Sequence, residues 1–334
     1  MKKAAYFEKK DKQKVQCQLC PHYCLLKKGE LGKCRVRRNV NGDLLSENYE
    51  RISSLSIDPI EKKPLYHFYP GTDILSIGSV GCNLKCKFCQ NYQISQTSVD
   101  DYPFLKSYTS EEIINAALTH SSNTGIAYTY NEPIIWFEYV LETAKLAHEN
   151  GINNVLVSNG FINPAPLDEF ISVFDAFSID LKGFTESFYH DFTDSKLEPI
   201  KQNLIKLAKS GKHLEITNLV ITGINDDEII FREMIEWIAA FCGKNTVLHI
   251  SRYFPMFKID NLPTPQSKLE SLYTIAKEYL NFVYLGNIKT ENGQNTYCPN
   301  CNELLISRHG YKVEIDHLNE LGACAKCNHP IIKN

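Results

Sequence analysis

The chain has 334 residues, 43% hydrophobic and 22% charged, with a formal net charge of −3. This length and composition suffice for one large core with small appendages. The slightly acidic balance argues against a nucleic-acid-binding protein. The charged start, residues 1–14, precedes no apolar stretch, and no run of about 18 apolar residues occurs. We therefore expect a cytoplasmic protein that has neither a signal peptide nor a membrane span.

The 12 cysteines are many for a reducing compartment, where clustered cysteines bind metal more often than they form disulfides. All but Cys242 fall in three clusters, and we interpret Cys242 as a buried apolar side chain. The clusters divide the chain into an N-terminal cysteine-rich segment (1–70), a middle domain (71–290) and a C-terminal cysteine-rich segment (291–334). The polar stretch 289–296 is typical of a linker.

The N-terminal cluster has the spacing C-x2-C-x3-C-x9-C and could close a four-thiolate metal site. Zinc is the favoured metal. A second iron–sulfur cluster is the alternative, although the spacing departs from the ferredoxin pattern. His22 could replace one thiolate. The surrounding lysines and arginines are a solvated face or a docking site for an acidic electron donor. The expected ligands are Cys17, Cys20, Cys24 and Cys34.

In the middle domain, short apolar runs without strict alternation separate helical patterns, which predicts parallel strands buried on both faces. The runs are 73–80, 125–131, 153–160, 176–183, 214–223 and 246–254, and 281–287 is a further candidate. The predicted helices include one that begins at the capping box Thr109–Glu112 and one that runs from Pro133 to Asn150. The others cover 166–174, 197–210, 228–241 and 265–280. This βαβα order predicts an α/β fold with a parallel sheet, either open or closed into a barrel.

The sequence GCNLKCKFCQN (81–91) follows the first predicted strand directly, with Cys82, Cys86 and Cys89 in the spacing C-x3-C-x2-C. In a parallel barrel, this loop lies at the carboxyl end of the strands, where active sites sit. A 4Fe–4S cluster has four irons, each needing a ligand, so three thiolates leave one iron open. The amine and carboxylate of an amino acid could chelate that iron. A zinc site completed by a distant residue, or three incidental cysteines, are the alternatives.

This stretch resembles the radical SAM signature C-x3-C-x-Φ-C, with Phe88 at the aromatic position. The resemblance implies a partial (β/α)6 TIM-like barrel with S-adenosylmethionine (SAM) on the open iron of a 4Fe–4S cluster. It also implies reductive cleavage of SAM to a 5′-deoxyadenosyl radical, which abstracts hydrogen from a substrate. Longer stretches (58–71, 81–96 and 127–133) resemble the radical SAM member of the AmmeMemoRadiSam system, which is related to pyruvate formate-lyase activating enzymes.

The resemblance also suggests SAM contacts at the ends of the second to fourth strands. Glu132 stands where relatives carry Gly-Gly-Glu and would hold the methionine amine, although a carboxylate at a helix N-terminus is favourable without SAM. Ser158 and Asn159 resemble a motif that reaches the ribose, but Val157 replaces the family's preceding Asp. Asp180 and Lys182 would meet the ribose and the methionine carboxylate, or form a simple ion pair.

Further candidates lie at the next two strand ends. Val220 and Thr222 resemble residues that line the adenine pocket. His249 and Arg252 could face SAM or the substrate, whereas a satisfied core histidine is the alternative for His249.

The C-terminal cluster consists of two C-x2-C pairs separated by 22 residues. This pattern is typical of a four-thiolate zinc ribbon, with a rubredoxin-like iron as the alternative. Such a site supplies folding free energy to a segment that is too small for its own core. The expected ligands are Cys298, Cys301, Cys324 and Cys327.

The hypothesis from the sequence is therefore a radical SAM enzyme with an unidentified substrate. Within that chemistry, a glycyl-radical enzyme activase is the alternative, and a non-enzymatic zinc-binding scaffold is the alternative of another class. The implied partners are an electron donor of flavodoxin or ferredoxin type and, from the subgroup resemblance, Memo-like and AMMECR-type proteins. We expect neither nucleic acid nor membrane as a partner.

Overall fold

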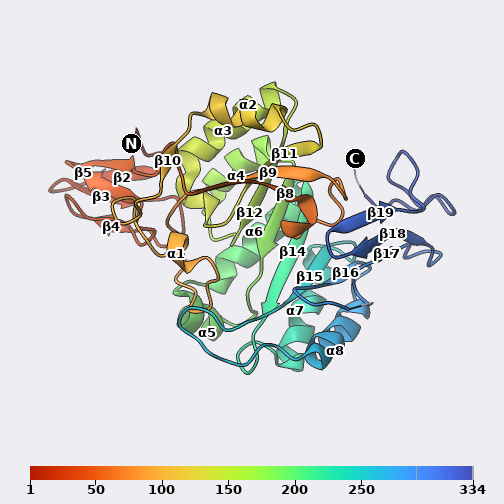
Figure 1. Ribbon diagram of the computed structural model, residues 1–334. Helices are drawn as coiled ribbons and strands as arrows, with labels where there is room; N and C mark the ends of the chain where they lie inside the picture. The colour runs from red at the N-terminus through yellow and green to blue at the C-terminus, as the bar shows by residue number, and fades with distance from the viewer. Residues whose placement is uncertain (291, 333–334) are drawn as a thin grey trace.

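Three regions follow one another in the computed structural model, which describes residues 1–290 and 292–332 (Figure 1). A central α/β unit carries small sheets of the N-terminal segment on one side and a small sheet of the C-terminal segment on the other. Residue 291 of the expected linker and residues 333–334 of the expected C-terminal segment lie outside the described residues.

The central unit is built on an eight-stranded sheet with the order β16-β15-β14-β13-β12-β11-β9-β8. All neighbours from β9 to β16 pair parallel, and β8 pairs antiparallel with β9. The strands are β8 (Ser54–Pro59), β9 (Asp73–Gly78), β11 (Asn123–Tyr128), β12 (Asn153–Ser158), β13 (Ala176–Asp180), β14 (His213–Val220), β15 (Val247–Arg252) and β16 (Val283–Gly286).

The predicted fold class, an α/β partial (β/α)6 TIM-like barrel with cysteine-rich segments at both ends, is confirmed, and the candidate run 281–287 contains strand β16. Strand β8 was not predicted, and it lies within the segment expected to precede the middle domain. Its sequence SLSIDP lacks a continuous apolar run, because an edge strand buries less of its surface than a central one.

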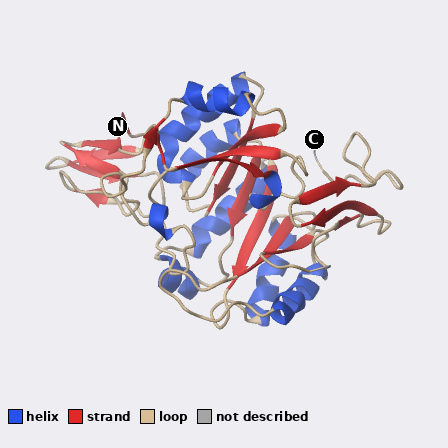
Figure 2. Ribbon diagram, viewed as in Figure 1, coloured by secondary structure: helices blue, strands red, loops and turns tan. Residues whose placement is uncertain are grey.

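Helices connect consecutive parallel strands and flank the sheet (Figure 2). The capping box at Thr109 is formed in both directions, with Glu112 as its partner. The predicted helix from Pro133 begins instead as a 3-10 turn, η2 (Pro133–Trp136), before α3. The α-helices are α1 (Tyr92–Ser95), α2 (Ser110–Leu118), α3 (Phe137–Glu149), α4 (Pro164–Val173), α5 (Glu186–Phe188), α6 (Leu197–Lys209), α7 (Glu228–Phe241) and α8 (Gln266–Lys277). The remaining helical turns are η1 (Ile60–Lys62) and the π-helical η3 (Tyr189–Thr193).

The cysteine-rich segments form small antiparallel sheets. Buried Arg37 fixes the N-terminal segment to α3, because it pairs with Glu138 at 2.9 Å and donates to the Ala5 carbonyl at 2.6 Å. The N-terminal strands are β1 (Lys2–Lys3), β2 (Phe7–Lys10), β3 (Lys14–Cys17), β4 (Leu25–Leu26), β5 (Arg37–Val40), β6 (Asp43–Ser46) and β7 (Arg51–Ile52), which pairs with β10 (Lys106–Ser107). The C-terminal strands are β17 (Thr296–Tyr297), β18 (Leu304–His309) and β19 (Lys312–Ile315).

The segment 58–71 closes the amino end of the barrel. Its side chains Ile60, Leu65 and Phe68 form one buried cluster with strand residues that include Ile74 and Ala176. The buried Glu215 carboxylate accepts hydrogen bonds from the backbone N–H of Tyr66 at 2.9 Å and from that of His67 at 2.7 Å. His249 Nε2 lies 2.6 Å from the same carboxylate. His249 is buried and hydrogen-bonded to Glu215, which agrees with the alternative of a satisfied core histidine.

Candidate active site

The loop with Cys82, Cys86 and Cys89 follows β9 at the carboxyl end of the sheet. Gly81, at its start, has φ of +89°, and a Cβ there would lie 2.5 Å from the Cys34 carbonyl oxygen. Only glycine fits this backbone, because the position combines a left-handed conformation with a close approach of the N-terminal segment.

The residues after β11 hold both ends of the cysteine loop. Asn131 accepts a hydrogen bond from the Ser79 N–H at 2.9 Å and donates to the Gly81 carbonyl at 3.0 Å. The Tyr130 carbonyl, in a residue with φ of 70°, accepts from the Asn91 side chain at 2.7 Å. The turn at Tyr130 also explains why β11 ends at Tyr128, earlier than predicted. The loop geometry is thus fixed by a neighbouring strand end.

The three thiols are shielded from solvent to different degrees: Cys86 is buried, while Cys82 and Cys89 are partly exposed. Cys82 Sγ accepts from the Leu84 N–H at 3.3 Å, and Cys89 Sγ lies 3.0 Å from Ser95 Oγ. Burial raises the pKa of the Cys86 thiol to about 12, although Lys182 opposes the rise. At this position the thiolate form therefore needs a bound cation to stabilise it. The iron of a cluster is such a cation.

Glu132 joins the end of β11 to the end of β12. Its buried carboxylate accepts from Ser158 Oγ at 2.7 Å, from the Asn159 N–H at 2.9 Å and from the Ile134 N–H at 3.1 Å. Burial raises the pKa of Glu132 to about 7, against the lowering by these donors. A buried carboxylate of this kind would be stabilised in its charged form by a neighbouring ammonium group.

A chain of amides connects this carboxylate to the cysteine loop. The Asn159 side chain donates to Asn83 Oδ1 at 2.9 Å and lies 3.8 Å from Cys82 Sγ. Asn83 in turn donates to the Phe161 carbonyl at 2.8 Å. The structure thus brings together three predicted residues, Glu132, Ser158 and Asn159, with the first cysteine.

Asp180 and Lys182, at the end of β13, form an ion pair of 2.6 Å and lie beside Cys86. Although burial opposes the shift, the Asp180 carboxylate raises the pKa of Lys182 above its usual range. The ammonium therefore stays charged next to the cysteine loop. It can meet an anionic group such as a carboxylate.

The turn after β14 lies against this strand end, because Asn225 donates to the Lys182 carbonyl at 2.7 Å. Val220 is fully buried. Thr222 Oγ1 is a buried atom without a hydrogen-bond partner in the part of the chain that the structure describes. Phe88 packs against Phe188, with ring centroids 6.0 Å apart, so in the structure its contact is to protein. Arg252 donates to the Thr264 carbonyl at 2.8 Å.

Sequence reasoning missed Asn83, Asn131 and Thr217. Thr217 pairs in register with Asp180, and its buried Oγ1 lacks a partner among the described residues. The period of two along β14 places Thr217 on the same face of the sheet as Glu215. The amides of Asn83 and Asn131 sit in loops, where no periodicity indicates the direction of a side chain.

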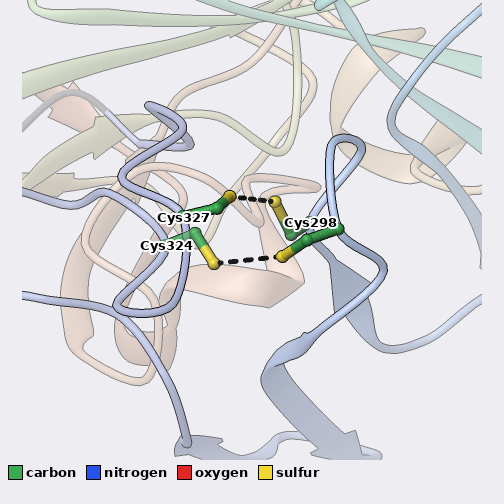
Figure 3. A group of neighbouring side chains, drawn as sticks. Cys298, Cys324 and Cys327 are labelled. Carbon is green, nitrogen blue, oxygen red and sulfur yellow. Dashed lines mark hydrogen bonds between the residues drawn. The ribbon is translucent and has the colours of Figure 1, made fainter.

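The C-terminal cysteines form the site that most resembles the binding shell of a single ion. Cys298 Sγ lies 3.5 Å from Cys327 Sγ, and Cys301 Sγ lies 3.7 Å from Cys324 Sγ (Figure 3). All four sulfurs lie within 4.8 Å of one another. A tetrahedral ion with bonds of about 2.3 Å separates its sulfurs by about 3.8 Å, so these residues could hold a metal ion.

The N-terminal cysteines line a pocket together. Its other lining residues include Leu19, His22, Arg37 and Ile135. His22 also lines this pocket, and its Nε2 lies 2.7 Å from the Asn83 carbonyl oxygen, which leaves Nδ1 as the other ring nitrogen. The four thiols on this pocket are Cys17, Cys20, Cys24 and Cys34.

The arrangement at the carboxyl end of the sheet fits a 4Fe–4S cluster with an open iron. Three cysteines on one loop supply three thiolates, and Glu132 and Lys182 supply charges that complement an amino acid's ammonium and carboxylate. The chain belongs to the radical SAM superfamily, whose model matches residues 76–238, and it is a radical SAM enzyme.

The chain is similar to two archaeal proteins. The chain is 40% identical over 336 residues to uncharacterized protein MJ0808 of Methanocaldococcus jannaschii, covering 99% of each. It is 27% identical over 238 residues to the putative glycyl-radical enzyme activating enzyme MJ1227 of the same organism, covering 67% of this chain and 92% of that protein.

Among solved structures, Streptococcus suis SuiB bound to S-adenosylmethionine aligns with a TM-score of 0.52 at 12% identity, covering 68% of this chain and 55% of SuiB. An identity this low shows a shared fold alone. Among the described residues, no helix combines the length and apolar character needed to cross a membrane.

The hydrogen bonds of Asn131 to Ser79 and Gly81 yield a prediction. The substitution Asn131→Ala removes the amide contacts to Ser79 and Gly81, each loss costing about 1–3 kcal/mol where the partner stays buried. We expect the variant to retain less iron than the wild type after anaerobic reconstitution. The measurement is iron and sulfide content per chain. Asn150→Ala is the control, because that amide contacts only the exposed end of α3. Equal iron content in all three proteins would contradict the role of Asn131 in holding the cysteine loop.

Proposed function

We propose that this enzyme cleaves SAM reductively at a 4Fe–4S cluster held by Cys82, Cys86 and Cys89. When bound, the cluster and SAM supply a 5′-deoxyadenosyl radical, which abstracts hydrogen from the substrate. The observation that carries the proposal is the convergence of three thiols, the Glu132 network and the Asp180–Lys182 pair on one end of the sheet.

The protein residues have distinct roles in this proposal. Glu132 holds the ammonium group of SAM, and Lys182 meets its carboxylate, with Asp180 orienting Lys182. Ser158 and Asn159 fix the Glu132 carboxylate and stand near the ribose. Val220 and Thr222 border the adenine, and the unpartnered Thr222 hydroxyl is available as a hydrogen-bonding group. Phe88 supports the loop by packing.

The subgroup proposal is the radical SAM member of the AmmeMemoRadiSam system. It is supported by the stretches 58–71, 81–96 and 127–133 and by the presence of both cysteine-rich segments. The substrate in this proposal is a molecule bound to, or a residue of, a Memo-like or AMMECR-type partner. Deuterium transfer into 5′-deoxyadenosine from a labelled partner would test it, and the absence of transfer from either protein would count against it.

A glycyl-radical enzyme activase is the second candidate, supported by the similarity to MJ1227, whose printed description names that activity. In that case the hydrogen comes from a glycine of a partner enzyme. A glycine-centred radical signal on the partner after reaction would distinguish this activity from the first.

We propose zinc for the C-terminal site. The sulfur separations of 3.5 and 3.7 Å suit a single tetrahedral ion, and the proposed reaction requires no electron transfer through this site.

We also propose that the electron donor is an acidic protein of flavodoxin or ferredoxin type. It would dock near the exposed Lys33 and Lys85, which both pair with Asp194; Lys33 precedes Cys34, and Lys85 lies within the cysteine loop. A rate of reduction by flavodoxin that does not fall with added salt would argue against this surface.

The proposed reaction is tested by Cys86→Ala. We expect this variant to lose reductive SAM cleavage, because two thiolates on the loop no longer hold a site-differentiated cluster. The assay incubates the anaerobically reconstituted protein with SAM and dithionite and measures 5′-deoxyadenosine. Cys242→Ala, outside all three clusters, should retain cleavage. Full cleavage by Cys86→Ala would refute the proposal.

Glu132 predicts a pH dependence of SAM affinity. Its raised pKa, about 7, means that the carboxylate gains a proton as the pH falls through neutrality and then attracts an ammonium group less. We expect wild-type affinity to fall from about pH 8 to about pH 6. Glu132→Gln should bind SAM roughly 10- to 100-fold more weakly, without this pH dependence.

Equilibrium dialysis with labelled SAM measures both effects, with iron content confirming that each protein holds its cluster. Glu149→Gln, on the exposed end of α3, is the matched control. A wild-type pH profile retained in Glu132→Gln would assign the titration to another group.

The zinc proposal predicts that Cys301→Ser loses about one zinc per chain, since a structural site needs all four ligands. Metal analysis of the wild type, this variant and Cys242→Ser measures the loss. Proteolysis should increase in the C-terminal segment of Cys301→Ser, because metal binding contributes folding free energy. Iron in place of zinc at this site would overturn the assignment.

A further inference from the structure

The four N-terminal cysteines line one small pocket together, with a free cavity volume of about 10 Å³. Cys17, Cys20 and Cys34 are buried, and Cys24 is partly exposed. The walls between them are largely apolar, with Leu19 among them.

The C-terminal site provides an internal comparison. There four sulfurs lie within 4.8 Å of one another, as around a single ion. Among the described residues, the N-terminal thiols do not form such a group, and no hydrogen bond joins two of their sulfurs. A cubane cluster holds its thiolates farther apart than a single ion does, because each thiolate binds a different iron. Among the described residues, the N-terminal thiols are therefore not arranged as the shell of a single ion, which favours a cluster.

The pocket also offers donors suited to sulfur. Backbone N–H groups of His22, Lys33 and Val36 approach the thiols of Cys20, Cys24 and Cys34, in that order. Arg37 is 1% exposed, lines the pocket and carries a buried Nε–H without a hydrogen-bond partner among the described residues. A buried donor of this kind is costly unless an acceptor is bound. Thiolate and inorganic sulfide are such acceptors.

This pocket adjoins the cysteine loop of the active site. His22, two residues after Cys20, contacts the carbonyl of Asn83, the neighbour of Cys82. On the other side, the Cys34 carbonyl lies 2.5 Å from where a Cβ on Gly81 would stand. Two direct contacts therefore connect the two sites. The C-terminal cysteines belong to a separate cluster with Leu305, Ile306 and Val313.

We propose that Cys17, Cys20, Cys24 and Cys34 hold a 4Fe–4S cluster that delivers electrons to the active-site cluster. In each transfer the N-terminal cluster loses one electron and is oxidised, and the active-site cluster gains it and is reduced. A one-electron donor protein of flavodoxin or ferredoxin class then reduces the N-terminal cluster again. No bond or proton moves. The relay rests on the proposed function, whereas the presence of the N-terminal cluster does not.

Metal content tests the site. Wild-type protein should hold about eight irons and eight sulfides per chain. The triple variant Cys82→Ala/Cys86→Ala/Cys89→Ala should retain about four of each and give a 4Fe–4S paramagnetic signal on reduction. Cys20→Ala/Cys24→Ala should also retain about four, and combining all five substitutions should remove the iron. Cys242→Ala should match the wild type.

Each alternative has a different result. About four irons in the wild type, all lost in the triple variant, together with a second zinc, would overturn the N-terminal cluster. About four irons that persist in the triple variant but vanish in Cys20→Ala/Cys24→Ala would instead contradict the proposed active site. If a variant does not fold, the wild-type iron count and its Mössbauer spectrum still decide.

Reduction kinetics test the relay. Photoreduced flavodoxin should reduce the active-site cluster of the wild type in a fast phase that is lost in Cys20→Ala/Cys24→Ala. Dithionite, which is small enough to reach the active site directly, should reduce both proteins alike. An unchanged fast phase with flavodoxin would overturn the relay while leaving the metal assignment intact.

Discussion

The active site depends on a short loop that holds three thiols in place without a fourth. Such a loop gains no closed metal shell of its own, so its geometry must come from neighbouring segments. Asn131 hydrogen-bonds to Ser79 and Gly81 at the start of the loop, and the Tyr130 carbonyl accepts a hydrogen bond from the Asn91 side chain at its end. The same turn presents Glu132 to the next strand. One strand end thus fixes both the cysteines and the carboxylate proposed to bind SAM.

Burial gives the loop a second requirement. The pKa of the Cys86 thiol rises to about 12 because the site excludes water, so the neutral form is favoured until a cation binds. Lys182 and the backbone N–H of Cys86 offset part of this cost. Iron binding should therefore strengthen the docking of the N-terminal segment, since Gly81 and Asn83 touch Cys34 and His22 directly.

Much of this could be predicted from the sequence, because parallel strands buried on both faces leave continuous apolar runs and their carboxyl ends share one edge. That rule brought Glu132, Ser158 and Asn159 together before any geometry was known. The rule does not fix how deep along its strand a side chain lies. His249 also belongs to a strand near that edge, but it is satisfied by Glu215. Strand β8 was missed because an edge strand carries too little apolar pattern.

The cysteine clusters show a further limit of sequence. The chain has two sets of four cysteines. The C-terminal sulfurs lie within 4.8 Å of one another, whereas the N-terminal cysteines line a pocket. The difference arises from chain folding between the pairs. At the C-terminus two knuckles face each other across β18 and β19, whereas at the N-terminus Cys34 comes from a separate loop ahead of β5. Spacing alone could therefore name the ligands but not the size of the group they hold.

Segment 58–71 covers the amino end of the barrel, and the cysteine loop lies at the opposite, carboxyl end. At the carboxyl end, the loop after β15 covers part of the cysteine loop. The Lys258 N–H donates to the Lys87 carbonyl at 2.9 Å, and Phe257 stacks on Tyr92. Its side chains Phe254 and Met256 are exposed. The N-terminal segment flanks the cysteine loop through Cys34 and His22. The N-terminal segment and the loop after β15 therefore border the cysteine loop as two separate neighbours.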